Sequence, residues 1–179
     1  MLNIATKKAA IRVWLVNAMS ITVVFAKQGA PIPDRPCAIL AILSVRKFGQ
    51  DHKTKITVVD DEGTREIIGT RLIMCSVNVY GADALENAEK AISALEMFSV
   101  QQDLKSADLA INPHTQINDL ERVIDTKFEG RAQFDIQFAT SSTTEEDMSW
   151  IETVGMTEEY VAVEGGEVVL ERTYTIDVE

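Results

Sequence analysis

The segment RAQFDIQF (131–138) constrains the fold most, because apolar and polar residues alternate in it without exception. Successive side chains of a β-strand point to opposite faces of a sheet, so this pattern predicts a half-buried strand, which we place at residues 128–140. Its large apolar positions are Phe134, Ile136 and Phe138. Its polar positions are Arg131, Gln133, Asp135 and Gln137. The polar face has three candidate neighbours, namely water, a substrate or another copy of the chain.

Other apolar segments predict further strands earlier in the chain. The predicted strands are 21–25, 37–48, 55–59 and 64–80. The second of them begins apolar on both faces, as a central strand covered on both sides does. The last two flank the turn sequence Asp60-Asp61-Glu62-Gly63 and predict a long hairpin with an exposed tip. Gly69 interrupts the final strand and predicts a β-bulge.

Three helices and a second hairpin complete the predicted elements. The helices are 5–19, 81–98 and 100–106, and the hairpin spans 157–178. Asp83 is the predicted N-cap of the second helix. The apolar stripe of that helix is Leu85, Ala88, Ile92 and Leu95. This order predicts an α+β fold, with a mostly antiparallel mixed sheet packed by an N-terminal helix and a central helix pair, and a C-terminal β-hairpin extension.

The charge is distributed unevenly along the chain. The net charge is −11, yet residues 141–179 contain eleven acidic residues and one basic residue, so the first 140 residues are nearly neutral. We therefore predict a domain at 1–140 and an acidic linker with a β-hairpin extension of the same domain at 141–179. Because an acidic segment repels phosphate, this composition argues against nonspecific nucleic-acid binding there. It suits either a surface that keeps copies apart or one that binds a basic partner.

A modest group of basic residues surrounds the predicted long hairpin. Its members are Arg46, Lys47, Lys53, Lys55, Arg65 and Arg71. Phe48 is the one Phe, Tyr or Trp residue between Arg46 and Arg71, and without further interleaved aromatic residues a nucleic-acid site is unfavourable. Their sign instead suits ion pairing with the acidic tail of a neighbouring copy.

The sequence offers no constellation of residues for catalysis, and we predict no enzyme activity and no cofactor. His52 and His114 are predicted loop residues without metal-ligand spacing, and Cys37 and Cys75 lie in apolar runs as buried free thiols. The acidic turn at residues 60–62 could hold a hard cation, but it also closes a hairpin without one. No apolar stretch is long enough to cross a membrane.

The segment AKQGAPIPDRP (26–36) contains three of the four prolines. Its backbone cannot pair regularly, so it predicts an irregular loop, which we call the proline loop. Loops of this length are usually functional or interfacial. Gly29, Pro31 and Pro33 would give the loop a rigid contact surface.

Three stretches together resemble a known family. They are VVFAKQGAPIPDRPCAIL after a helix that contains Trp14, GTRLIMCSVNVYGADAL, and FEGRAQFDIQFATSSTTEEDMSWIETV. In order and spacing they resemble the neck or tail terminator (tail-completion) proteins of tailed bacteriophages. The resemblance covers roughly residues 8–154, and residues 155–179 fall outside it.

This resemblance implies a subunit of a ring, usually of six copies, at the head-proximal end of the phage tail. Such a ring ends polymerisation of the tail tube and provides the docking surface for the head or its connector. The implied partners are further copies, the tail tube, the sheath protein in tails that have one, and a neck protein on the head side. DNA would only pass through the lumen, and the protein would be a virion component assembled in the host cytoplasm. The residues expected at contacts are Gly29, Pro31, Pro33, Arg131, Gln133, Asp135 and Gln137.

Two other readings remain open at this point. One is a different neck or connector protein of the same kind of virion. The other is a non-viral ligand-binding or regulatory α+β domain, which would show a melting shift with its ligand.

Overall fold

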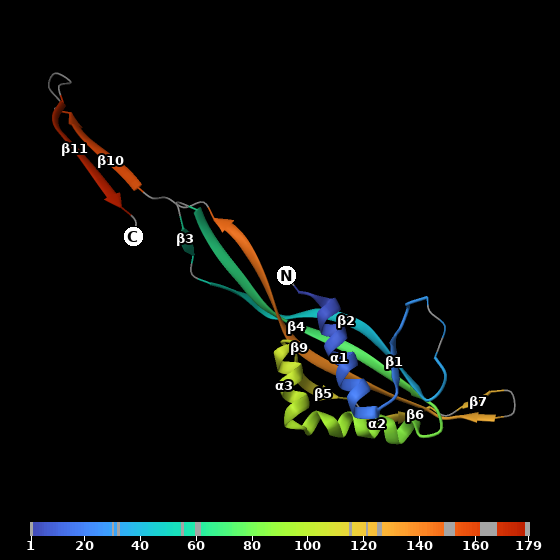
Figure 1. The fold of residues 1–179 in the computed structure, drawn as a ribbon. Helices are drawn as coiled ribbons and strands as arrows, with labels where there is room; N and C mark the ends of the chain where they lie inside the picture. The colour runs from blue at the N-terminus through green and yellow to red at the C-terminus, as the bar shows by residue number, and fades with distance from the viewer. Residues whose placement is uncertain are drawn as a thin grey trace. The chain divides into compact units, whose positions relative to one another are not determined.

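The structure is a computed structural model that describes residues 2–29, 31, 33–54, 56–59, 62–114, 116–120, 122–124, 127–148, 153–161 and 168–177. Its helices are α1 (Ile4–Met19), α2 (Ala84–Ser93), the 3₁₀ turn η1 (Ala94–Glu96) and α3 (Phe98–Ser106) (Figure 1). Its longer strands are β1 (Thr22–Phe25), β2 (Cys37–Lys53), β4 (Glu62–Tyr80), β5 (Ala110–His114), β9 (Arg131–Met148), β10 (Thr153–Val161) and β11 (Val168–Asp177). Its short strands are β3 (Thr57–Val59), β6 (Asn118–Asp119), β7 (Arg122–Ile124) and β8 (Lys127–Glu129).

The main sheet has the strand order β1-β2-β4-β9-β5, with β3 paired to β4 and β6 paired to β9. β1 and β2 are parallel. The pairs β2 with β4, β3 with β4, β5 with β9 and β6 with β9 are antiparallel. β7 with β8 and β10 with β11 form separate two-stranded sheets. The predicted α+β class with a mostly antiparallel mixed sheet is therefore confirmed.

The chain divides into two compact units. The first consists of Met1–Lys53 and Ile67–Thr144, and the second of Thr54–Glu66 and Glu145–Glu179. In the second unit β3 pairs with the start of β4, Arg65 forms an ion pair of 2.8 Å with Glu146, and β10 pairs with β11 as the predicted C-terminal hairpin. Asp60 and Asp61 of the predicted turn lie outside the described residues.

One face of the sheet in the first unit carries the hydrophobic core. The pairing of Ala38 with Val79 and of Leu40 with Val77 places these buried residues on one face, where they join the buried residues of all three helices in a single cluster. β9 contributes alternate positions to this cluster, namely Ala132, Phe134, Ile136 and Phe138, each 0% exposed. The alternation predicted for this strand is confirmed, and the apolar area that it removes from water is a main source of stability.

The central helix pair differs from the prediction in two details. Asp83 occupies the N-cap of α2, but its side chain makes no capping hydrogen bond. Leu85 was predicted in the apolar stripe and is 48% exposed, whereas the buried positions of α2 include Ala84, Ala88 and Ala91. The buried side of α2 is therefore centred on the alanines, and Leu85 lies outside it.

β2 and β4 also differ from the predicted hairpin. β3 pairs antiparallel with β4 on the two sides of the predicted turn, so the predicted hairpin is confirmed, but over only three residues. The main partner of β4 is β2. β2 continues to Lys53, so His52 lies in a strand rather than in a turn. The register between β2 and β4 shifts between Phe48 and His52, opposite Gly69, and the irregularity predicted at this glycine is confirmed.

Asp51 occupies the space that this irregularity creates. A Cβ atom on Gly69 would collide with the Asp51 carboxylate, which pairs with Arg71 at 2.8 Å and with Lys47 at 3.0 Å. A side chain at this position would therefore displace the Asp51 carboxylate from its ion pairs.

We expect the carboxyl group of Asp51 to titrate far below a normal aspartate. Hydrogen bonds from Arg71 and Lys47 lower its pKa to about 2. An NMR titration of the side-chain carbon should show this inflection, and Arg71→Gln should move the pKa back towards the ordinary value. Arg46→Gln, on the neighbouring part of β2, is the control and should leave the titration unchanged. An inflection near the ordinary aspartate pKa in the wild type would contradict the prediction.

Candidate site on the open face of the sheet

The face of the sheet opposite the helices in the first unit is the candidate site, and we call it the open face. β9 places its predicted polar residues Arg131, Gln133, Asp135 and Gln137 there, all half-buried. β4 adds Ser76, Asn78 and Tyr80, which alternate with the core residues Val77 and Val79. Both sets follow from the period of two in a β-strand, so each strand supplies one apolar and one polar face.

Side-chain hydrogen bonds order this polar surface across neighbouring strands. Arg131 Nη2 donates to Asn78 Oδ1 at 2.7 Å, and Gln133 Nε2 donates to Ser76 Oγ at 3.2 Å. At the other side of β9, Asn112 Nδ2 donates to Gln137 Oε1 at 3.1 Å. These bonds already hold the side chains of the open face in one arrangement. Binding of a partner here would therefore cost little conformational entropy of these side chains.

The proline loop reaches the open face through Arg35. Its guanidinium lies 5.7 Å from the centroid of the Tyr80 ring, and that of Arg131 lies 5.5 Å from the same centroid. Arg35 also forms an ion pair with Glu129, whose side chain is 6% exposed. Contacts of a cation with an aromatic face and with a buried carboxylate hold the end of the loop against the sheet.

The predicted contact residues of the proline loop, Gly29, Pro31 and Pro33, precede Arg35 in the chain. Gly29 has a φ of 67°, a left-handed conformation that favours glycine. Gly29 and Pro31 line a small cavity of about 140 Å³ together with Val24 and Ile39, which are paired neighbours in β1 and β2. Pro33 is half-buried. The loop and the strand face therefore meet through Arg35, which sequence reasoning missed because no local pattern connects it to Tyr80 or Glu129.

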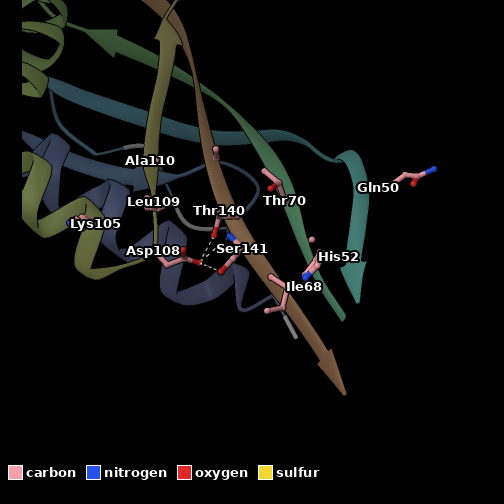
Figure 2. Close-up of a pocket in the computed structure, with 12 residues that line it drawn as sticks. Gln50, His52, Ile68, Thr70, Lys105, Asp108, Leu109, Ala110, Thr140 and Ser141 are labelled. Atoms are coloured by element: carbon pink, nitrogen blue, oxygen red, sulfur yellow. Dashed lines mark hydrogen bonds between the residues drawn. The ribbon is translucent and has the colours of Figure 1, made fainter. Parts of the chain in front are cut away.

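A second hollow, of about 450 Å³, lies in the first unit (Figure 2). Its lining includes Gln50, His52 and Thr70 from β2 and β4, and Asp108 with Thr140 and Ser141 from the opposite side. Asp108 Oδ2 already accepts hydrogen bonds from both hydroxyl groups and from the Ser141 backbone N–H. These hydrogen bonds connect the segment between α3 and β5 to β9. A carboxylate that accepts so many hydrogen bonds is poorly placed for proton transfer.

The described residues contain no cluster of three or more His, Cys, Asp or Glu side chains with the geometry of a metal site. Cys37 and Cys75 are free and buried, as predicted, and burial, together with the charge of Asp135, raises the pKa of the Cys75 thiol to about 12. A membrane-spanning helix is likewise not found in the described part of the chain.

Comparison with known families identifies the kind of protein that carries this surface. A family model described as "Phage neck terminator protein" matches residues 8–164, which include the proline loop, the central helices and the whole of β9. A search of curated proteins finds no match. The resemblance inferred from the three quoted stretches is confirmed, because the match covers most of the chain. The chain belongs to the phage neck terminator proteins, a family of structural proteins of bacteriophages.

Proposed function

We propose that this protein forms a ring, of six copies by family resemblance, at the head-proximal end of a phage tail. There it ends polymerisation of the tail tube and provides the docking surface for the head or its connector. It would contact the tube, a neck protein on the head side and, in tails that have one, the sheath. It would be assembled in the host cytoplasm and remain in the virion, with DNA passing only through the lumen.

The observation that carries this proposal is the ordered open face of the sheet. A ring needs heterologous interfaces, in which one surface of each copy meets a different surface of the next. Three of the four predicted β9 residues on the open face have a defined side-chain hydrogen bond within the chain. Residues 1–140 would then supply the ring body, and the acidic segment 141–179 would be an extension of it.

The wild-type protein tests this proposal directly. Mass photometry should detect a ring of defined stoichiometry, either alone or with the tail-tube protein of the same phage. In infected cells that lack the protein, electron microscopy should show tubes of uncontrolled length. A protein that stays monomeric with and without the tube protein would contradict the proposal. Imaging its position in the particle distinguishes a terminator from another neck or connector protein.

The double substitution Gln133→Lys and Asp135→Lys tests the open face. We expect a loss of about 1 kcal/mol or less in the free energy of unfolding, because neither side chain is in the core. Ring assembly or tail capping should nevertheless be impaired, because two cations replace a neutral and an acidic contact. The matched control is Gln102→Lys with Asp103→Lys, which makes the same change of charge on exposed positions of α3. If assembly survives the first pair unchanged, the open face lies against water.

A further inference from the structure

A group of basic residues without acidic neighbours lies where α1 meets β1. Residues 1–33 contain four basic residues and no acidic one. Lys7 pairs with Asp108, Lys8 and Arg12 lie at Phe25, and Lys27 follows Phe25 by two residues in the chain. Lys8 Nζ is 4.6 Å from the centroid of the Phe25 ring, and the guanidinium carbon of Arg12 is 5.9 Å from it. We call Lys8, Arg12, Phe25 and Lys27 the basic patch.

The positive charge of this patch is not balanced within the described part of the chain. The ion pairs found there involve Lys7, Arg35, Lys47, Arg65 and Arg71, and none involves a cation of the basic patch. Lys8 and Arg12 are four residues apart on one helix, a spacing at which like charges destabilise. The Phe25 ring and a hydrogen bond of 2.8 Å from Arg12 Nε to the Val23 carbonyl position these cations nevertheless.

The basic residues around β2 and β4, predicted to pair with an acidic tail, are largely compensated instead. Lys47 and Arg71 share Asp51, and Arg65 pairs with Glu146 of the same chain. Lys55 lies outside the described residues. Arg46 and Lys53 of this group have no ion pair among those of the described residues. The basic patch differs from them because it lies in residues 1–33, a part of the chain that contains no acidic residue.

The acidic C-terminal segment contains a matching imbalance. In the hairpin of β10 and β11, Glu159 is paired directly opposite Glu171. These two residues are among the eleven acidic residues of the segment 141–179, which contains one basic residue, Arg172. The composition of this segment is therefore complementary in charge to the basic patch.

We propose that the basic patch of one copy binds the acidic segment 141–179 of the next copy through complementary charge. The proposal rests on the assembly put forward under the proposed function and names one of its contacts. The contact is heterologous, so repeating it gives a directional chain of subunits that can close into a ring. A second copy fits better than DNA, because the chain carries a net charge of −11 that repels phosphate.

Charge reversal on each side tests this contact. Lys8→Glu, Arg12→Glu and Lys27→Glu together reverse the patch, and Glu159→Lys with Glu171→Lys reverses the hairpin. Each variant should associate at least about tenfold more weakly than the wild type by mass photometry, since exposed ion pairs contribute about 0.2–1 kcal/mol each. Salt of about 0.5 M should weaken the wild-type assembly in the same direction.

Mixing supplies the decisive measurement. A 1:1 mixture of the two variants should assemble again, because complementary charges then meet at every contact of an alternating ring. The chain that carries both sets of reversals should also assemble by itself. The control Arg46→Glu, Lys53→Glu and Lys105→Glu reverses three exposed cations elsewhere and should leave association within about twofold of the wild type. Circular dichroism verifies folding, and glutamine at the three patch positions replaces glutamate if the triple variant does not fold.

Several outcomes would overturn the proposal. One such outcome is a patch variant that assembles as tightly as the wild type. Another is a control variant whose assembly is weakened as much as that of the patch variant. Recovery in the doubly reversed chain without recovery in the mixture would place the contact within one chain. Loss of DNA retention with intact assembly would assign the patch to DNA. In each of these cases the proposed function is still supported if the wild type forms rings. A wild type that never assembles, even with tube protein, would overturn both the proposed function and this contact.

Discussion

Replacing Phe138 with alanine is expected to lower the free energy of unfolding by about 3–5 kcal/mol. Phe138 is 0% exposed in β9, and its ring meets Trp14 of α1 edge to face, with the centroids 6.1 Å apart at an angle of 76°. The substitution removes a large buried surface and leaves a cavity between the sheet and α1. It also removes an aromatic pair, which contributes about 0.5–1.5 kcal/mol beyond the buried area.

Urea denaturation followed by circular dichroism measures this loss. The matched control is Gln137→Ala, one residue earlier on the same strand but on the open face, which should cost about 1 kcal/mol or less. The contrast between neighbouring positions tests the assignment of the two faces of β9. Equal losses at both positions would show that the assignment is wrong.

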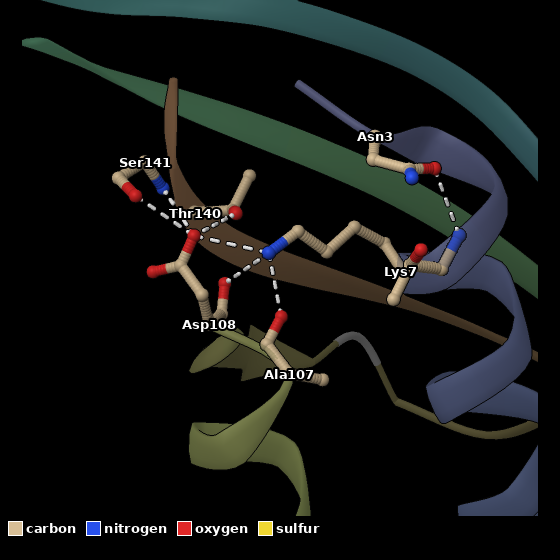
Figure 3. A network of polar contacts seen from close by, with 7 residues as sticks. Asn3, Lys7, Ala107, Asp108, Thr140 and Ser141 are labelled. Carbon is tan, nitrogen blue, oxygen red and sulfur yellow. Dashed lines mark hydrogen bonds and ion pairs between the residues drawn. The ribbon is translucent and has the colours of Figure 1, made fainter. Parts of the chain in front are cut away.

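Removing the carboxylate of Asp108 is the second substitution with a large expected effect. Figure 3 shows Asp108 between Lys7 of α1 and Thr140 and Ser141 of β9. Lys7 Nζ donates to Asp108 Oδ2 at 3.0 Å and to the Ala107 carbonyl at 2.5 Å, and the Lys7 side chain is only 11% exposed. Asp108→Ala leaves this buried cation without its counter-ion, which costs about 3–5 kcal/mol for a fully buried pair.

The expected loss is smaller here, about 1–3 kcal/mol, because the Asp108 side chain is 53% exposed and solvent screens the pair. Asp108 also has a φ of 53°, which alanine adopts less readily than aspartate or asparagine. Asp108→Asn retains the shape and the backbone preference and therefore isolates the charge. Thermal and urea denaturation of both variants should rank alanine below asparagine and asparagine below the wild type.

The stability that Asp108 contributes should depend on pH with a definite sign. Burial raises the pKa of this carboxyl group, but hydrogen bonds from Lys7, Ser141 and Thr140 outweigh burial and hold the pKa below its ordinary value. The contribution is therefore complete above the unfolded-state pKa of about 3.9 and is lost as the pH falls through the folded-state pKa. The gap between wild type and Asp108→Asn should be full at neutral pH and shrink in acid. A gap that widens in acid would contradict this account.

Local sequence patterns predicted the elements of this fold well where one strong period governs a segment. The alternation in β9 placed Phe134, Ile136 and Phe138 in the core, and the structure confirms this. The helix pair was also predicted, since the helical period is a local signal. The outlying Leu85 shows the limit of such signals, because the rotation of a helix depends on how closely its neighbours pack.

Strand partners were predicted less well, for a related reason. Segments 55–59 and 64–80 looked like the two strands of one hairpin, since they flank a turn sequence. They do form a hairpin, but over only three residues, and β4 pairs mainly with β2, which continues to Lys53 through two register shifts. A bulge costs little when a side chain such as that of Asp51 finds ionic partners in it, and those partners come from two different strands.

The sequence by itself determined which residues of β9 face the core and which form a polar surface, because the period of a strand is a local property of the chain. It also determined the charge asymmetry between the first 33 residues and the last 39. Only the tertiary structure decided what these features meet. The pairing of strands distant in sequence brings Arg35 and Arg131 to the Tyr80 ring, and the packing of α1 beside β1 gathers Lys8 and Arg12 at Phe25. Such contacts depend on register and packing over the whole sheet, which no local pattern encodes.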